Sequence, residues 1–387
     1  MEASSQRAAI RTIVISSVEP EPTTAGQIKL YRHLAENQNI KLLVQHSERR
    51  FFAKKNYRHR LVSRLERTRF RKWIADSELL RSARWLDSYL PAPPSDGISN
   101  VVVTMAHGNG CSAALRYARK HGLPLVTFFD DWWPEMDCVH SPLRRVLEDR
   151  FRELYQQSQL AFCVCEGMKS NLGPHGNSHV LYPMPGKSNL RLAAQQASDK
   201  FKVFYFGNLH EYGPMMAEAL KNIKGHPLIR LEVRGGNPNW PGEFRQRMQA
   251  EQMWHDYASR SELELWLSSA DAFVIPMVFE PNMSRRMETS FPSKMLEMAQ
   301  LGKPLIIWGP EHCSAVQWAR QGNRALYITD PNPHALRRAL ETLITSPVEK
   351  ERLAAAARAV SESEFNPDRI QARFTQLLMD LLTTQPK

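Results

Sequence analysis

The residues best suited to chemistry stand at an expected helix start. Pro292 lies in the first turn of this helix, and Ser290 or Ser293 can cap it. Gly302 follows the helix and Pro304 stops it. Free backbone N–H groups at a helix start attract anions, because the peptide dipoles point the same way. The pattern therefore predicts an anion site where the helix begins.

Two charged residues lie inside the same helix. Glu297 stands one turn in, where a carboxylate can accept hydrogen bonds from vicinal hydroxyls such as those of a ribose. Lys294 shares a helical face with Glu297 and can offset the negative charge of a phosphate. Together with the anion site, these residues indicate nucleotide binding. The alternative is an ordinary amphipathic helix with a solvated Glu297.

Two adjacent acids follow an apolar run earlier in the chain. Asp130 and Asp131 come directly after Leu125–Phe129, which is predicted to be a buried strand. Ligands of doubly wound sheets bind outside the carboxyl ends of the strands. Paired acids at this edge can orient a substrate hydroxyl. A turn that caps the next helix is the alternative.

Glycine turns follow other expected strands. His107 opens the sequence His-Gly-Asn-Gly, between a strand and a helix, and its backbone amides can meet a phosphate. A plain strand–helix turn is the alternative there. Gly207 and Asn208 open the second half of the chain in the same way, and Gly207 lets a ligand approach the backbone closely.

Strands and helices alternate through most of the chain, which predicts doubly wound α/β units. The expected strands are Thr12–Val18, Lys41–His46, Asn100–Met105, Leu125–Phe129, Leu160–Cys165, His179–Tyr182, Lys202–Phe206, Ile229–Arg234, Ala272–Pro276, Leu305–Trp308 and Ala325–Ile328. The expected helices are Ala25–Asn37, Cys111–His121, Pro142–Gln157, Met215–Lys221, Ser261–Ser269 and Pro292–Leu301, and Pro347–Leu382 reads as helices only.

A polar stretch near residues 193–200 divides the alternation into two series. We expect an N-terminal domain over 1–195, a second domain over 196–365 and a last helix over 366–387 that packs back on the first domain. Two such αβα sandwiches would face each other across a cleft, at the carboxyl ends of both sheets.

Positive charge is concentrated in one segment. Between residues 49 and 72 the chain has eleven Lys or Arg and one acid, whereas the whole chain has a net charge of +11. Phe, Leu and Trp residues alternate with these charges as far as residue 74, which is typical of a helix on an anionic lipid surface. An RNA-binding patch and a solvated basic loop are the alternatives. Because the rest of the chain is nearly neutral, we do not expect nucleic acid as a general partner.

Several classes of protein are excluded by absent motifs. The 387 residues include no run of ~18 apolar residues, which a membrane span needs, and no secretory signal. The chain has no G-x-G-x-x-G, Walker or G-x-S-x-G sequence. Because C-x-x-C and D-x-D are also absent, we expect no metal ion. The five cysteines fit a reduced, cytoplasmic protein.

The order of the motifs resembles the family-four retaining glycosyltransferases. The segment S-K-M-L-E-M-A-Q-L-G-K-P-L-I, from Ser293, resembles the donor-binding segment of that family. Similar blocks occur in the family's order at 26–35, 123–135, 163–169, 204–209 and 261–276. The likeness therefore covers about residues 10–345.

This resemblance implies an α/β fold of the GT-B type and a retaining, hexosyl-type transferase (EC 2.4) of cytoplasmic polysaccharide biosynthesis. A nucleoside-diphosphate sugar would be the donor substrate, no cofactor or metal would be needed, and the acceptor would be a glycan or lipid-linked saccharide. Basic residues 49–74 would contact the inner face of a membrane. The implied catalytic residues are Asp131 and Lys294, to which the glycine turn described above adds His107. The donor-binding residues are Gly207, Asn208, Ser290, Phe291, Ser293, Lys294 and Glu297, and the acceptor-side residues are Gly26 and Asp130.

Two departures from the family pattern support alternatives. Thr289 stands where many members have an acid, and Asn208 and Tyr212 stand where many have Arg and Lys. One alternative is a non-catalytic relative of the same fold that serves as a scaffold at a membrane. The other is a nucleotide-sugar epimerase or hydrolase.

Overall fold

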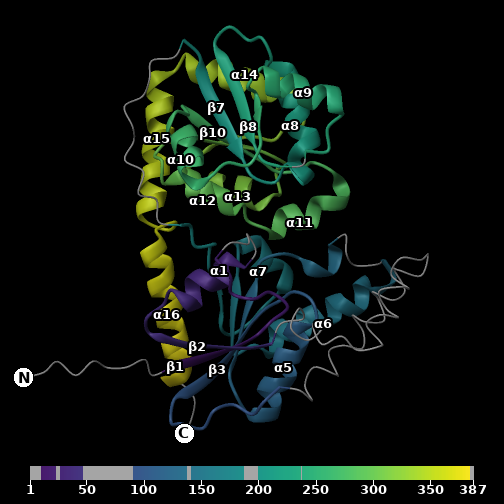
Figure 1. The fold of residues 1–387 in the computed structure, drawn as a ribbon, viewed down its shortest axis with the longest axis vertical. Helices are drawn as coiled ribbons and strands as arrows, with labels where there is room; N and C mark the ends of the chain where they lie inside the picture. The colour runs from purple at the N-terminus through teal and green to yellow at the C-terminus, as the bar shows by residue number, and fades with distance from the viewer. Residues whose placement is uncertain are drawn as a thin grey trace, which may run out of the picture. The chain divides into compact units, whose positions relative to one another are not determined.

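The chain folds into two compact units, shown as a ribbon in Figure 1. The structure, a computed structural model, describes residues 10–22, 27–46, 90–136, 141–186, 199–236 and 238–383. Unit 1 comprises Met1–Leu181 together with Gln371–Lys387, and unit 2 comprises Tyr182–Ile370. Two links in the chain therefore join the units.

A six-stranded parallel sheet forms the centre of unit 1. Its strands are β1 (Ile10–Ile15), β2 (Ile40–His46), β3 (Ser99–Met105), β4 (Leu125–Phe129), β5 (Leu160–Cys163) and β6 (Ser178–Val180). They lie in the order β2-β1-β3-β4-β5-β6. Because β1 is flanked by β2 and β3, the direction of winding reverses between β1 and β3.

Helices cover both faces of this sheet, because successive residues of a strand point to opposite sides. Phe128 of β4 packs on Phe374, and its neighbour Phe129 packs on Phe151 and Tyr155. The helices of this unit are α1 (Ile28–Leu30), which continues as a π-helix (Tyr31–Ala35), α5 (Gly110–His121), two 3-10 turns (Trp133–Glu135 and Ser141–Leu143), α6 (Arg144–Gln157), α7 (Glu166–Leu172) and most of α16 (Pro367–Thr383).

Unit 2 contains a second parallel sheet of six strands. These are β7 (Phe201–Phe206), β8 (Ile229–Arg234), β9 (Trp254–His255), β10 (Ala272–Pro276), β11 (Leu305–Trp308) and β12 (Leu326–Ile328). Their order is β12-β11-β10-β7-β8-β9. The winding reverses between β7 and β10, which places the ligand edge of this sheet at the ends of those two strands.

Figure 1 shows α8 and α15 on opposite sides of the second sheet. The helices of unit 2 are α8 (Leu209–Ile223), α9 (Gly242–Ala250), α10 (Arg260–Ser268), a 3-10 turn (Pro281–Met283), α11 (Ser284–Thr289), α12 (Ser293–Ala299), α13 (Ser314–Arg320), α14 (Pro333–Ile344) and α15 (Pro347–Glu362). Helix α14 packs against α8, and α12 packs against α15.

The expected doubly wound α/β architecture is confirmed for both units, and every expected strand overlaps an observed one. Strand β9 was missed because two residues give no periodic signal. Helix α8 begins before Pro214, not after it as expected, since Asn208 caps its first turn and the helix tolerates the proline. Within the described ranges, every helix is too short or too polar to cross a lipid bilayer.

Candidate functional site

The loop after β7 lies at the winding reversal of unit 2. Gly207 adopts φ +148°, a conformation that side-chain-bearing residues rarely take, and its N–H donates to Arg234 O at 3.0 Å. A Cβ on Gly235 would lie 2.3 Å from Gly207 O. The ends of β7 and β8 are therefore in direct backbone contact, and glycine is required at both positions.

Asn208 serves the next helix with its side chain. Its Oδ1 accepts hydrogen bonds from the N–H groups of His210, at 2.9 Å, and Glu211, at 3.4 Å. These two N–H groups have no partner inside the helix, so the contacts stabilise the start of α8. The side-chain oxygen of Asn208 thus has a structural role at the position where sequence indicated donor binding.

Lys294 and Glu297 lie beside the same strand end. Lys294 Nζ donates to Glu297 Oε2 at 3.1 Å and lies 5.0 Å from the ring centroid of Phe206, the last residue of β7. The Lys294 side chain is 43% exposed and that of Glu297 is 30% exposed, so solvent reaches both. The expected shared helical face is present, and it brings a cation and a carboxylate to the ligand edge of unit 2.

The start of α12 differs from the expectation. Pro292 itself is the N-cap residue, with no side-chain capping hydrogen bond, so the prediction that Ser290 or Ser293 caps this helix is wrong. Ser290 instead ends α11, and its carbonyl oxygen accepts from the Ser314 hydroxyl. Ser293 is the first residue of the helix.

Phe291 points into an aromatic cluster. Its ring centroid lies 4.8 Å from that of Tyr182, 6.1 Å from that of Phe365 and 6.3 Å from that of Trp318. The residue is 6% exposed. Its side chain therefore contributes to packing. Only its main chain is left to contact a ligand.

A second ion pair lies near the β7 end. Arg286 Nη2 of α11 lies 3.0 Å from Glu211 Oε2 in the first turn of α8, and the side chains are 24% and 14% exposed. Sequence reasoning did not identify Glu211 as a site residue. No signal in the sequence connects two residues 75 positions apart.

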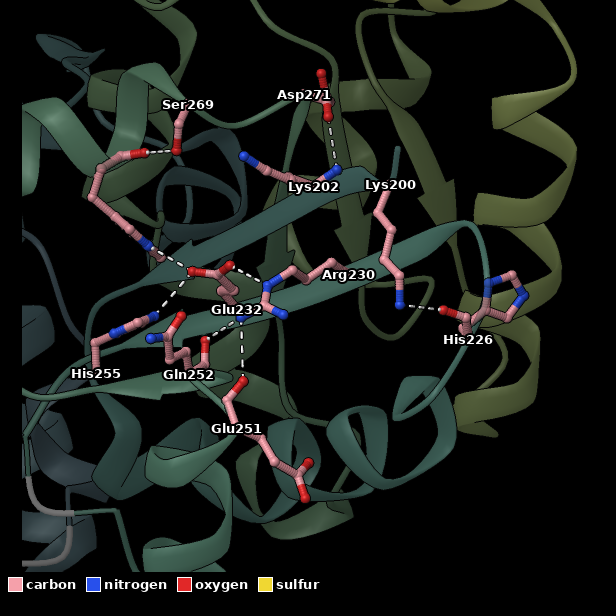
Figure 2. A network of polar contacts seen from close by, with 11 residues as sticks. Lys200, Lys202, His226, Arg230, Glu232, Glu251, Gln252, His255, Ser269 and Asp271 are labelled. Carbon is pink, nitrogen blue, oxygen red and sulfur yellow. Dashed lines mark hydrogen bonds and ion pairs between the residues drawn. The ribbon is translucent and has the colours of Figure 1, made fainter. Parts of the chain in front are cut away.

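A buried polar network occupies the next strand, β8. Figure 2 shows the Glu232 carboxylate between Arg230 and His255. It accepts from Arg230 Nε, from His255 Nε2 at 2.9 Å and from Trp266 Nε1 at 2.9 Å. Burial alone would raise the pKa of Glu232, but these hydrogen bonds outweigh it and lower the pKa to about 2.

This network extends towards the ligand edge. The indole of Trp266 stacks on the ring of Phe204 in β7, with 4.2 Å between the ring centroids. The guanidinium carbon of Arg234 lies 5.0 Å from the ring centroid of Trp266. Arg234 Nη1 also donates to Asp256 O at 3.1 Å, in the loop after β9. Sequence reasoning missed the network, although Arg230, Glu232 and Arg234 alternate with apolar residues and so lie on one face of the strand.

Unit 1 brings another charged group to its own ligand edge. Lys29 Nζ, from α1, lies 3.1 Å from Asp130 Oδ2, directly after β4, and the side chains are 18% and 13% exposed. Burial lowers the pKa of Lys29, but attraction by Asp130 and Asp131 outweighs it and raises the pKa above its ordinary 10.5. Sequence reasoning predicted both acids at this edge and missed the lysine.

The turn after β3 lies at the winding reversal of unit 1. The ring of His107 lies 5.9 Å from that of Trp133, two residues after Asp131. Gly110 N–H donates to Ser17 Oγ at 2.8 Å, and a Cβ on Gly110 would lie 2.2 Å from Ser17 N. The ends of β1 and β3 are therefore in contact.

Two sequence predictions fall on undescribed parts of the chain. Gly26 and the basic segment 49–74 lie outside the described residues. Among the residues that are described, no group of three or more His, Cys, Asp or Glu is placed to hold a metal ion.

Comparison with known proteins identifies a domain in unit 2. Residues 200–346 match the family model of the Glycosyl transferases group 1. No protein in a curated collection matches the chain significantly. The matched range contains β7 to β12 and every predicted donor-binding residue.

The fold resembles solved structures along nearly its whole length. A HepE structure from Anabaena in complex with UDP-glucose has a TM-score of 0.62 and 13% identity, covering 95% of this chain and 99% of that one. Sucrose-phosphate synthase from Thermosynechococcus elongatus has a TM-score of 0.63 and 12% identity, covering 97% and 100%. A glycosyltransferase from Rickettsia africae has a TM-score of 0.60 and 11% identity, covering 97% and 99%. The chain therefore has the GT-B fold, with two doubly wound parallel units.

Proposed function

We propose that this chain transfers a sugar from a nucleoside-diphosphate sugar to an acceptor hydroxyl. The observation that carries the proposal is the glycosyl transferases group 1 domain at 200–346, which holds Lys294 and Glu297 beside the end of β7. Structures of the similar HepE protein contain UDP, or UDP-glucose, which supports a nucleotide-sugar donor.

The donor would bind mainly to unit 2. Glu297 would accept hydrogen bonds from the ribose hydroxyls, and Lys294 would offset charge on the diphosphate. Arg286 would supply a second cation in place of the Arg and Lys that stand elsewhere in the resembling family. Gly207 would admit the donor close to the backbone. Cations at a leaving diphosphate stabilise the charge that develops in the transition state.

The acceptor would bind mainly to unit 1. Asp131 and His107 would act on the reacting groups, with Asp130 and Gly26 on the acceptor side. A glycan or a lipid-linked saccharide is the acceptor class that the resemblance implies. We further propose retention of the anomeric configuration and transfer of a hexosyl group without a metal ion.

The proposed location is cytoplasmic, at the inner face of a membrane, in polysaccharide biosynthesis. This part rests on the sequence of residues 49–74 alone, where basic and aromatic residues alternate. Anionic lipid headgroups would attract such a segment.

Position 289 keeps a non-catalytic alternative open. Thr289 is fully buried, and its hydroxyl donates to Arg285 O at 2.8 Å, so this side chain serves α11. The acid that many members of the resembling family have at this position is therefore replaced by a buried threonine. A scaffold protein of the same fold would show this substitution without loss of function.

Incubation with a panel of sugar nucleotides tests the proposal. The panel contains UDP-, GDP- and ADP-linked hexoses, each with and without p-nitrophenyl hexosides and a prenyl-diphosphate-linked saccharide. A transferase releases nucleotide at a rate that rises with acceptor, and the product linkage gives the stereochemistry. An epimerase or hydrolase turns over without acceptor, and a scaffold turns over none of them.

A further inference from the structure

The Lys29–Asp130 pair is placed where a ligand would reach it. Asp130 directly follows β4, at the carboxyl edge of the unit 1 sheet, and Lys29 comes from the helix that follows β1. Both side chains are less than one-fifth exposed, so the 3.1 Å contact is sheltered from solvent. Sheltered pairs are screened less than surface pairs, and their geometry is better defined.

A second buried cation of unit 1 provides a contrast. Arg11, near the start of β1, is 4% exposed and donates to Asp96 Oδ1 at 2.9 Å. Asp96 is 47% exposed and lies before β3, at the amino edge of the sheet. This edge is opposite to the one at which ligands of doubly wound sheets bind. The Arg11–Asp96 pair is therefore structural, whereas the Lys29–Asp130 pair stands at the ligand edge.

The Lys29 ammonium contacts only one of the two carboxylate oxygens of Asp130. Lys29 Nζ binds Oδ2 of Asp130, which leaves the second oxygen able to accept from another donor. The fixed ammonium also restricts the rotation of the carboxylate. A carboxylate held in this way is suited to accept a hydrogen bond from a substrate hydroxyl.

We infer that Lys29 is a positioning residue of the acceptor site, which holds Asp130 so that its carboxylate orients the acceptor hydroxyl. This inference rests on the proposed function, and it assigns a role that the sequence patterns did not indicate. Lys29 acts through Asp130 and need not touch the donor. Loss of the ammonium would leave Asp130 in place but badly oriented, and small misplacements of a reacting group cost about 10- to 100-fold in rate.

Kinetics of four variants test the inference, with the donor and the p-nitrophenyl hexoside that the wild-type chain uses. Lys29→Met should lower kcat/KM for the acceptor by about 10- to 100-fold and leave the donor KM within about twofold. Lys29→Arg keeps the charge and should recover most of the loss. Asp130→Asn should resemble Lys29→Met, and the double variant should be no worse than Asp130→Asn, because both changes remove one function.

Rescue by the conservative variant separates positioning from simple stability. A loss of acceptor kcat/KM in Lys29→Met that Lys29→Arg recovers, with the donor KM unchanged in both, shows that the cation beside Asp130 acts on the acceptor step and does not merely hold the fold. Arg11→Met is the matched control. It removes another buried cation of the same unit, at the opposite edge of the sheet, and should lower thermal stability with an unchanged acceptor KM.

Two failures are distinguishable. If the wild-type chain transfers no sugar in the panel, the proposed function fails and this inference fails with it. If transfer occurs but Lys29→Met keeps the wild-type acceptor kcat/KM, or loses no more than Arg11→Met, the inference alone is overturned. Should Lys29→Met not fold, unchanged acceptor kinetics in Asp130→Asn would overturn it equally.

Discussion

Glu297 is the residue on which donor recognition depends most. Its carboxylate pairs with Lys294 at 3.1 Å and is reached by solvent, so ribose hydroxyls can compete for it. We predict that Glu297→Ala raises the donor KM by about 10- to 100-fold and lowers kcat, since hydrogen bonds to a charged group contribute about 1.5–3 kcal/mol. Steady-state kinetics with varied donor measures this effect.

Glu264→Ala is the matched control for that prediction. Glu264 pairs with Arg260 on the surface of α10, so its removal takes a carboxylate from the same unit without touching the β7 end. Its donor KM should equal that of the wild-type chain. Wild-type kinetics in Glu297→Ala would remove the main donor-binding assignment.

Removing Arg286 and removing the charge of its partner Glu211 should change nucleotide affinity in opposite directions. Arg286→Met removes a cation from the β7 end and should weaken nucleoside-diphosphate binding about tenfold. Glu211→Gln should strengthen binding, because Arg286 then keeps its charge without an internal partner. Titration calorimetry with UDP, GDP and ADP at two salt concentrations measures both changes, and both should shrink at high salt.

The two variants check each other. If Glu211→Gln weakens binding as much as Arg286→Met does, the pair only holds α8 against α11. In that case Arg286 would not contact the diphosphate, and the cation would have to come from elsewhere.

Site residues could be predicted from the sequence only where neighbouring residues in the chain indicate their role. Glu297 and Lys294 stand three residues apart on one helix, so helical spacing alone placed them together. Asp130 followed from the apolar strand before it. Lys29 and Glu211 could not be found in this way, because their partners lie 101 and 75 residues away and only the folded chain brings them together.

At the scale of elements, β8 owes part of its stability to Glu232. The pKa of this carboxyl lies at about 2 in the folded chain, below its ordinary 4.5, because the hydrogen bonds it accepts outweigh its burial. A carboxyl with a lowered folded pKa stabilises the fold above the ordinary value and loses that contribution as pH falls towards the folded value. We therefore predict that unit 2 loses about 3 kcal/mol between about pH 4.5 and pH 2.

Urea unfolding followed at several pH values measures this loss. Glu232→Gln should be less stable at neutral pH and should lack this part of the acid dependence, since the amide cannot ionise. Glu264→Gln, a surface change on α10, should keep the wild-type acid dependence. An acid profile that is the same in Glu232→Gln and the wild-type chain would show that the network contributes no ionic stabilisation.

The two sheets could be predicted more accurately from the sequence than the residues at which the helices begin. Continuous apolar runs such as Ala272–Pro276 show burial on both faces, which is specific to parallel sheets, so both sheets were expected. Helix starts were harder to place. The proline at 214 indicated a helix that begins after it, yet the Asn208 cap starts α8 six residues earlier. A capping contact of this kind outweighs the local preference of one residue.

For the molecule as a whole, the C-terminal residues complete unit 1 although they follow unit 2 in sequence. Phe374 of α16 is fully buried, with its ring centroid 4.9 Å from His33, 5.4 Å from Phe162 and 5.8 Å from Phe128. Beside this cluster, His33 Nδ1 lies 3.0 Å from Gln371 Oε1. The core of unit 1 therefore depends on a segment that follows unit 2 in the sequence.

This dependence predicts a selective loss of stability. Phe374→Ala in the full chain should destabilise unit 1 by about 3–5 kcal/mol, the usual cost of removing a buried aromatic ring. Unit 2 has its own sheet and core, so nucleoside-diphosphate binding measured by calorimetry should persist while the unfolding transition of unit 1 moves to lower urea. Met379→Ala changes an exposed residue of the same helix and should move neither. The prediction is wrong if Phe374→Ala shows one urea-unfolding transition, shifted to lower urea, and loses nucleotide binding. That result would mean that the two units unfold cooperatively.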